Sequence, residues 1–494
     1  MTAPTRPLPD GFAESFACFD RLVGFLDGEA ASALSHAELE ERLDRDGRDL
    51  LRHLLQDHLD LRASREARLA DVLDAAGGRH GAVEAGHQRV LASMFGPVTV
   101  TRLAYRRRGE DNLYPADARL NVPAELHSHG LRRLAAIESA RGSFDEASHA
   151  ITQATGQHVA KRQVEDLTRR AATDVDAFYQ TAECSPAGPD DVLVLSADGK
   201  GIVMRPEALR PATAAAAVSA KLATRLSKGE KRNRKRLAEV GAVYDIIPVP
   251  RRPEDILGDG PTNAPVAKGK WLTASVVDSA ATVVASVFDE AERRDPRHQR
   301  TWVALVDGNN HQIDRIRAES AARTVKVAII IDFVHVLEYL WRAAWCFFAE
   351  GDPAAEVWVK DKALSVLHGN AATVAASIRR KATCCHLEPG ARVNADTCAT
   401  YLLRKQRYLR YSSALAKGWP IATGIIEGAC RHLVKDRMDI TGARWGLEGA
   451  EAVLKLRAVR SNGDFASYWD YHLAQERTRL HESRYADGVL LRAA

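Results

Sequence analysis

The hydrophobic pattern predicts helices in the first part of the chain and a short β region after it. Leucines recur at helix-face spacing, which predicts a helical region over residues 1–90 with a break at Gly77 and Gly78. From Phe95 the pattern changes to alternation, which predicts a strand or hairpin that ends near Arg108. The helical region is either a small bundle or an oligomerisation arm.

Residues 143–174 have the pattern of a helix-turn-helix. Ser143 and Glu146 form a capping box that starts the first helix, and Gly156 ends it. A second helix from about Ala160 turns an apolar face inward and a basic face outward. A basic second helix is what reading of the DNA major groove requires, although pairs of short helices are common elsewhere. The candidate DNA-contacting residues on this helix are Lys161, Arg162 and Gln163. We assign residues 91–183 to a DNA-binding region.

Strands alternate with helices after a linker near residue 185. Five apolar runs predict strands, and they lie at Val192–Leu195, Val240–Ile247, Trp271–Val277, Trp302–Val306 and Val325–Ile331. Helices are predicted around Glu290–Arg294 and at His311–Ala322. The order of three strands, helix, strand, helix and strand is that of an RNase H-like domain. We therefore predict an α/β fold with an RNase H-like core at 190–332.

The rest of the chain has a helical pattern. Residues 333–418 predict an all-helical insertion, and residues 419–494 predict a helix that carries Glu427 followed by further helices. Basic and aromatic residues interleave near the end of the insertion, at Tyr401, Arg404, Lys405, Arg407, Tyr408, Arg410 and Tyr411.

Composition and charge narrow the functional classes. The 494 residues are 46% hydrophobic and 27% charged, which excludes collagen-like and wholly disordered chains. The net charge is only +4, but residues 1–80 carry 10 Lys/Arg against 16 Asp/Glu, so the later part is distinctly basic. This asymmetry favours a polyanionic partner for the later domains.

The cysteines and the apolar runs of the sequence indicate in which cellular compartment the protein functions. The seven cysteines are scattered without a CxxC pair, which predicts neither a disulfide framework nor a zinc site. The longest apolar run, around residues 325–348, is interrupted by charged residues, and the first residues lack the apolar core of a secretion signal. We expect a cytoplasmic protein without a membrane span.

Three acids are candidates for a catalytic centre. Asp198 and Asp307 each end a predicted buried strand, and Glu427 lies one turn inside a later helix. Carboxylates that converge repel one another unless a cation neutralises them, and two Mg²⁺ ions would do so while clamping a phosphodiester. Spacing alone is a weak signal, because acids are common in turns. Asp332 also ends a buried strand and competes with Asp307. If Asp307 is the metal ligand, Asp332 and His335 either support the metal ligands or contact DNA. The alternative is that Asp332 is only a helix cap and His335 is only a helix-face histidine.

Several segments resemble bacterial insertion-sequence transposases of the IS-Kra type, which belong to the DDE class and are distantly Mutator-like. The segments are Ser196–Gly201 (SADGKG), Leu305–Asn309 (LVDGN), Ile331–Trp341, Gly424–Met438 (GIIEGACRHLVKDRM) and Thr441–Trp445 (TGARW). The resemblance covers about residues 90–475. It implies an RNase H-like catalytic domain with a helical insertion, in which Asp198, Asp307 and Glu427 hold Mg²⁺ or Mn²⁺. It favours Asp307 over Asp332, because Asp307 ends the fourth strand. Some relatives have a cysteine pair that this chain lacks, so no zinc is expected.

Further residues are candidates for DNA contacts. Lys200 follows the first Asp, and residues 221–236 hold eight Lys/Arg that either bind the DNA backbone or form a solvated face. Within that run we select Lys231, Arg232, Arg234, Lys235 and Arg236. Arg431 and Lys435 lie four and eight positions after Glu427 and either face the same cleft or pair with Glu427. Trp445 either stacks on an unpaired base or anchors the core.

The sequence therefore predicts a transposase that binds terminal inverted repeats, cleaves at the element ends and joins the 3′-hydroxyl to target DNA. Pairing of two ends predicts a homodimer or a larger assembly, associated with the bacterial nucleoid. Two alternatives remain: a catalytically inactive or domesticated DNA-binding derivative, and an RNase H-like nuclease that cuts without joining.

Overall fold

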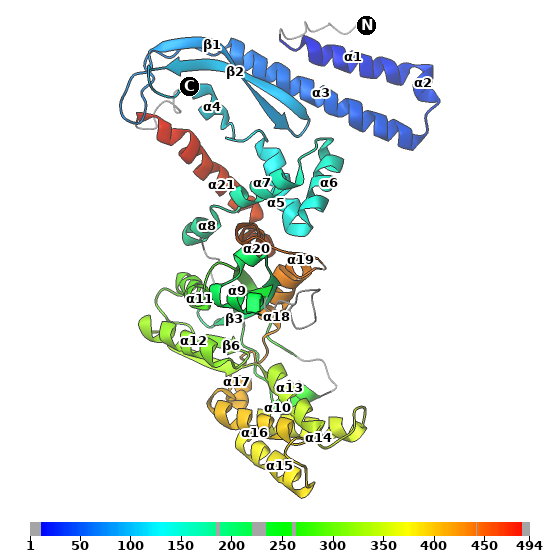
Figure 1. Cartoon of the computed structure of the whole chain (residues 1–494), viewed down its shortest axis with the longest axis vertical. Coiled ribbons are helices and arrows are strands. Elements are labelled where there is room, and N and C mark those ends of the chain that lie inside the picture. The colour runs from blue at the N-terminus through cyan, green and yellow to red at the C-terminus, as the bar shows by residue number, and fades with distance from the viewer. Residues whose placement is uncertain (1–10, 184–187, 220–233, 259–262, 441, 487–494) are drawn as a thin grey trace. The chain divides into compact units, whose positions relative to one another are not determined.

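A computed structural model describes residues 11–183, 188–219, 234–258, 263–440 and 442–486 (Figure 1). The chain is mixed α/β and divides into two compact units, Met1–Thr181 with Asp464–Ala494, and Ala182–Gly463. The expected C-terminal segment 419–494 is thus shared between the two units, because its last helix belongs with the N-terminal residues.

The first unit combines helices with one β-hairpin. Its elements are α1 (Ala13–Asp27), α2 (Glu29–Ser32), α3 (His36–Ser64), β1 (Ala82–Ser93), β2 (Gly96–Arg106), α4 (Pro115–Leu120), α5 (His129–Arg141), α6 (Phe144–Thr155), α7 (Lys161–Ala171), α8 (Val175–Thr181) and α21 (Phe465–Leu480). The long α3 runs along the hairpin, and Leu59 is buried against Val98 and Val100 of β2 (Figure 1).

The prediction of helix up to residue 90 is wrong at its end, because residues 82–90 belong to β1. Strand β1 pairs with β2 from Ala82↔Arg106 to Ser93↔Gly96. Most of its side chains on both faces are exposed or half-buried. A strand without one continuously buried face lacks the apolar alternation by which strands are recognised in a sequence.

The two helices predicted within residues 143–174 are confirmed as α6 and α7. Glu146 N donates to Ser143 Oγ at 3.1 Å, and Ser143 N donates to Glu146 Oε2 at 2.6 Å, so the capping box forms. Gly156 ends α6 with a φ of +69°, a backbone conformation that suits glycine. The pair packs on α5, which the sequence pattern did not single out, around a buried cluster of Leu131, Ala135, Ala147, Ile151, Val159, Val164 and Leu167.

The second unit is built on a five-stranded sheet. Its elements are β3 (Val192–Val203), α9 (Pro211–Ser219), β4 (Lys235–Ile246), α10 (Pro253–Leu257), β5 (Ala267–Ser275), α11 (Ala280–Arg294), β6 (Trp302–Val306), α12 (Asn310–Ala322), β7 (Val327–Ile331), α13 (Phe333–Ala344), α14 (Pro353–Leu367), α15 (Ala371–Cys384), α16 (Val393–Lys405), α17 (Tyr411–Ala416), α18 (Gly424–Ala429), a π-helical turn (Cys430–Lys435), α19 (Asp436–Met438) and α20 (Leu447–Asn462).

The sheet is mixed, with strand order β5-β4-β3-β6-β7. Strands β3, β4 and β5 are antiparallel, and β6 and β7 run parallel to β3. All five predicted strands are confirmed at their positions, whereas α9 and α10 were not predicted. Helix α11 packs on β3 and β4. A Cβ at Gly241 of β4 would lie 2.5 Å from Val287 of α11, so the glycine permits this close packing.

The predicted helical character of residues 333–418 is confirmed by α13 to α17. Helices α14, α15 and α16 lie side by side (Figure 1). Within the described ranges, no helix is both long enough and apolar enough to cross a membrane.

Candidate active site

Strand register places three aspartates in one row. Strands β3 and β6 pair in parallel from Leu193↔Trp302 to Ser196↔Leu305, an offset of 109 positions. Asp198 and Asp307 are separated by the same 109 positions, so extending the register sets them opposite each other. Paired side chains of parallel strands point to the same face of a sheet, which brings the two carboxylates together.

Asp332 extends this row by one strand. Strands β6 and β7 pair from Trp302↔Val327 to Val306↔Ile331, an offset of 25 that also separates Asp307 from Asp332. The backbone N–H of Asp332 donates to the carbonyl of Val306 at 2.8 Å, which continues the ladder past the strand ends.

Asp198 differs from its expected placement, because it lies inside β3 rather than at the strand end. Strand β3 continues to Val203 through its antiparallel pairing with β4, which reaches Val203↔Lys235. Its pairing with the shorter β6 ends at Ser196↔Leu305. Asp198 lies opposite Asp307 just beyond the last paired residues of β3 and β6.

The fourth acid, Glu427, lies beside this row on α18. The hydroxyl of Thr423 donates to Asp332 Oδ2 and lies 3.1 Å from Glu427 Oε1. Asp332 is 2% exposed, whereas Glu427 is exposed. Thr423 therefore links a buried carboxylate to an accessible one.

Cys430 is a functional candidate that sequence reasoning missed. Its thiol donates to Asp198 Oδ2 at 3.4 Å, while the backbone N–H of Gly199 donates to Oδ1 at 2.7 Å. Burial raises the pKa of Cys430, and the negative charge of Asp198 raises it further, so the thiol keeps its proton and remains a donor. The sequence spacing brings Cys430 near Glu427, but only the packing of α18 on β3 brings its thiol to Asp198.

The site concentrates negative charge. Burial raises the pKa of Asp198, and the carboxylates of Asp307 and Glu427 raise it further. Burial also raises the pKa of Asp332, with a further contribution from Glu427. Within the described ranges, none of these four acids forms an ion pair with Lys, Arg or His. Clustered carboxylate oxygens that form no ion pair with a side chain are the ligand set that a hard divalent cation prefers.

Glu239 is a further residue near the site that sequence reasoning missed. It lies on β4 opposite Gly199, next to the row. Burial raises its pKa, and Asp198 raises it further against the opposing effect of Arg210 and Arg315. Only the strand register reveals this proximity, because Glu239 is far from Asp198 in the sequence.

Asp307 and Asp332 differ in how their oxygens are engaged. Asp332 Oδ1 accepts from Val334 N at 2.9 Å and caps α13, and Oδ2 accepts from Thr423. Asp307 Oδ1 accepts from Asn309 N at 2.8 Å, while its Oδ2 has no hydrogen-bond partner in the described part of the chain. The helix-cap alternative thus describes Asp332, and Asp307 keeps an oxygen available for a metal ion.

His335 lies on α13 among aromatic rings. Its ring centroid is 5.4 Å from that of Tyr339 and 6.1 Å from that of Tyr401, and its Nδ1 is 3.8 Å from Glu338. The helix-face alternative fits these contacts. The two tyrosines also line a cavity beside Asp307, so His335 lies next to the lining of that cavity.

This cavity has a volume of about 610 Å³. The rings of Tyr339 and Tyr401 stack at 4.0 Å within its lining, and Tyr401 Oη donates to the backbone carbonyl of Asp307 at 3.3 Å. Arg404 and Lys405 also line it. The first half of the basic and aromatic segment thus borders the acid row.

The predicted recognition-helix residues lie together on the first turn of α7. Lys161, Arg162 and Gln163 are all exposed. Lys161 Nζ pairs with Asp145 Oδ2 at 2.5 Å, and Gln163 Oε1 accepts from Ala160 N at 3.2 Å. Arg162 is therefore the clearest candidate for contact with a base.

The basic run before β4 is described only in part, since Lys231 and Arg232 lie outside the described residues. Lys235 begins β4, and its Nζ is 3.4 Å from Asp439. Arg236 donates to the carbonyls of Val276 and Ala208, so its guanidinium serves a loop contact. Arg234 is half-buried just before β4, and Lys235 pairs with Val203, five positions along β3 from Asp198, so the strand register does not bring either residue to the acid row.

Lys200 lies on β3 two positions after Asp198 and is half-buried. Side chains two positions apart on a strand share a face, so Lys200 points to the same side as Asp198. Its positive charge acts on the thiol of Cys430, where it opposes the rise in pKa. The structure thus brings Lys200 close to the site.

The Glu427 helix is not the regular α-helix expected from the sequence. After α18 the chain forms the π-helical turn Cys430–Lys435, whose wider turn changes the rotational phase of later residues. Arg431 is highly exposed and lies 4.0 Å from Asp436, and Lys435 is exposed. Neither forms an ion pair with Glu427 within the described residues, so the pairing alternative does not hold.

Trp445 is a core anchor. It is 6% exposed, its indole N–H donates to the Met438 carbonyl at 3.0 Å, and the guanidinium of Arg437 lies 4.7 Å from its ring centroid. Its backbone joins the end of β3 through the carbonyl of Val203. The burial of the ring fits the core-anchor alternative and contradicts the alternative in which Trp445 stacks on an unpaired base.

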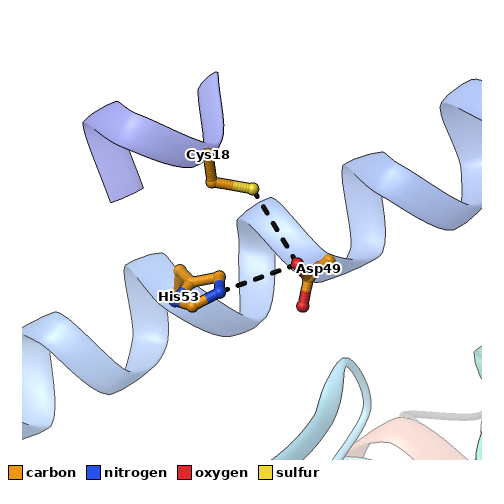
Figure 2. Close-up of side chains that lie close together, drawn as sticks. All are labelled: Cys18, Asp49 and His53. Carbon is orange, nitrogen blue, oxygen red and sulfur yellow. Dashed lines mark hydrogen bonds and ion pairs between the residues drawn. The ribbon is translucent and has the colours of Figure 1, made fainter. Parts of the chain in front are cut away.

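Figure 2 shows the tightest group of potential metal ligands in the described chain, which lies between α1 and α3: Cys18, Asp49 and His53. Their ligand atoms all lie within 4.8 Å of one another, closer together than those of the acid row. Arg52 donates to Asp49 at 2.7 Å and contacts the His53 ring at 2.8 Å. This guanidinium already neutralises the carboxylate, and a metal ion would have to displace it.

Comparison with known proteins adds no assignment. No protein-family model matches the chain, and no curated protein matches it. The function is therefore inferred from the residues and from the positions that the strand register gives them.

Proposed function

We propose that the chain is a DDE-type transposase of a bacterial insertion sequence, with an RNase H-like catalytic domain interrupted by the helical insertion 333–418. The observation that carries this proposal is the equal offset of 109 positions between β3 and β6 and between Asp198 and Asp307. The strand order β5-β4-β3-β6-β7 supports the fold, because it joins an antiparallel trio to two parallel strands.

The ligand set suits two Mg²⁺ or Mn²⁺ ions held by Asp198, Asp307 and Glu427. When bound, such ions supply Lewis-acid stabilisation for both the attacking and the leaving oxygen of a phosphodiester. Carboxylates that lie in a row on neighbouring strands can bind two ions side by side. A single ion would need all of its carboxylate ligands to converge on one point. The unpaired negative charge of the four acids supports this assignment.

The surrounding residues position these acids. Gly199 N–H and the Cys430 thiol hold the two oxygens of Asp198, and the Thr423 hydroxyl lies 3.1 Å from Glu427 beside the row. Asp332 fixes the start of α13 and the Thr423 hydroxyl, which makes it a positioning residue. The stacked pair of Tyr339 and Tyr401 borders the cavity at Asp307, where an unpaired nucleotide of the reacting strand would find an aromatic surface.

DNA contacts come from both units in this proposal. Arg162 and its neighbours on α7 would read the terminal inverted repeats, because an exposed second helix is the element that enters a major groove. Lys200 would meet a phosphate beside the acids, and Arg234 and Lys235 would meet phosphates at the start of β4. Two paired ends imply at least a homodimer, and a cytoplasmic, nucleoid-associated location follows from the substrate.

Two alternatives predict different reaction products. A nuclease would cut the end without joining it to a target, and an inactive derivative would bind the end without cutting it. The presence of all the expected acids, with an oxygen of Asp307 available, favours an active enzyme.

The test is cleavage and joining of a labelled duplex that carries an element end, with Mg²⁺. Asp307→Asn and Glu427→Gln should each abolish both steps while leaving end binding nearly intact. The exposed Asp361→Asn on α14 is the matched control and should behave as the wild type. Wild-type cleavage in either active-site variant would refute the assignment of that residue.

A further inference from the structure

A second set of cavities lies along the outer edge of the sheet, at β7. One cavity of about 390 Å³ is lined by Val327–Ile330 together with Arg317, Arg407, Arg410 and Lys417. A neighbouring cavity of about 670 Å³ is lined by Lys326 and shares Val327, Ala328, Lys417 and Trp419 with the first. Because they share these residues, the two cavities form one groove, which we call the β7 groove.

The β7 groove is basic, and neither of its cavities has Asp or Glu in its described lining. Five exposed cationic side chains line it, and they are Arg317, Lys326, Arg407, Arg410 and Lys417. None of the five forms an ion pair with a carboxylate of the described residues. Nearby Arg323 shows the contrast, since it pairs with three carboxylates. Five unpaired cations in one groove repel one another, and an anionic partner would relieve this repulsion.

Aromatic rings hold several of these cations in place. The guanidinium groups of Arg407 and Arg317 lie 4.6 Å and 5.6 Å from the ring centroid of Tyr408, and the ammonium of Lys417 lies 4.6 Å from that of Trp419. Cation–π contacts restrict the side chains without neutralising their charge. The charges are therefore positioned in advance and still available to a ligand.

Strand β7 is the last strand of the described sheet, so its outer edge offers backbone N–H groups as well. Proteins contact DNA phosphates with backbone N–H groups and with Arg and Lys side chains. A peptide could add to the same edge as a further strand, but strand addition does not require five cations in a lining without acids. The charge therefore favours a nucleic acid backbone.

We propose that the β7 groove binds the target duplex during strand transfer, an inference that rests on the proposed function. The lining of the groove follows β7 as far as Ile330, and Asp332 comes two positions later in the chain. Lys200, which would hold the element end beside the acids, lies on β3, at the opposite end of the acid row from β7 in the sheet order. Joining needs two DNA segments at the acids, and these two sides can each supply one.

The test compares two double variants of equal charge. Arg407→Gln with Arg410→Gln removes two groove cations, and Lys360→Gln with Arg380→Gln removes two exposed cations from α14 and α15 as a control. The groove variant should cleave the element end at the wild-type rate but join it to target DNA about tenfold more slowly at physiological salt. Its binding of a random duplex should show a log–log salt slope lower by about 0.9 for each phosphate that the variant no longer binds.

Three outcomes would overturn the inference. Joining at the wild-type rate together with an unchanged salt slope would mean that the groove binds no DNA. Equal loss of cleavage and joining would assign the groove to the element end instead of the target. If the control variant loses joining equally, the effect is one of net charge. A wild-type protein that never cleaves would refute the proposed function, and the salt slope would still decide whether the groove binds DNA.

Discussion

Replacing Asp198 by asparagine should stabilise the metal-free protein, although it should abolish catalysis. Burial raises the pKa of Asp198, and Asp307 and Glu427 raise it further. A carboxyl group whose pKa rises on folding destabilises the native state when it is ionised. Asparagine removes that charge and can still accept the hydrogen bond that Gly199 N–H donates to Oδ1.

The size of the effect follows from the strand register. Neighbouring strands lie about 4.8 Å apart, so two charges at that separation repel by about 3 kcal/mol at an effective dielectric constant of about 20, and by about 1 kcal/mol in bulk water. We expect the free energy of unfolding of Asp198→Asn to exceed that of the wild type by about 1–3 kcal/mol near neutral pH with a chelator present.

The pH dependence has a defined sign. Because the pKa of Asp198 is raised in the folded state, protonation favours folding, and this contribution is lost as the pH rises through the folded-state pKa. The difference between variant and wild type should thus be largest near neutral pH and shrink in mild acid.

Urea denaturation followed by tryptophan fluorescence measures this difference. Of the eight tryptophans, all but Trp469 lie in the unit Ala182–Gly463, so the signal reports mainly on the unit that contains the acids. Mg²⁺ at about 100 times its dissociation constant should stabilise the wild type by about 2.7 kcal/mol and the variant by much less. Asp361→Asn is the control. A variant less stable than the wild type in chelator, or equal stabilisation of both by Mg²⁺, would contradict this expectation.

Three further predictions test individual residues. Asp332→Asn keeps a side chain that can cap α13, so single-turnover cleavage should stay within about tenfold of the wild type, whereas Asp307→Asn should have none. Thr423→Val removes the hydroxyl donor to buried Asp332 and should lower the free energy of unfolding by about 1.5–3 kcal/mol, as measured by urea denaturation. Arg162→Ala should reduce the binding preference for the terminal repeat over a scrambled duplex by about 1–3 kcal/mol in competition binding. An unchanged preference would mean that another part of the chain recognises the repeat sequence.

The strands of the second unit could be predicted because their side chains are buried on both faces. Leu193, Val303 and Ala304 are all completely buried, and such strands appear in a sequence as continuous apolar runs. The helix pair α6 and α7 could be predicted for a local reason, since the capping box at Ser143 and the turn at Gly156 are adjacent in sequence.

The failures involve information that lies in tertiary contacts. Glu239 comes close to Asp198 only through the register of β4, and Cys430 reaches Asp198 only when α18 packs on β3. The π-helical turn after α18 has no clear signature in the sequence, so the regular helix spacing assumed for Arg431 and Lys435 does not apply. Burial of Trp445 likewise depends on its contact with the end of β3.

Transposase activity itself is tested by following a labelled element end incubated with the purified wild-type protein, Mg²⁺ and a target duplex. We expect a free 3′-hydroxyl at the element end, followed by its covalent joining to the target. We also expect Asp198→Asn, Asp307→Asn and Glu427→Gln each to bind the end and yield neither product, and Mn²⁺ to support the reaction in place of Mg²⁺. Cleavage and joining at the wild-type rate by any one of these variants, or end binding by the wild type without cleavage, would show that these three acids do not form the catalytic centre of a transposase.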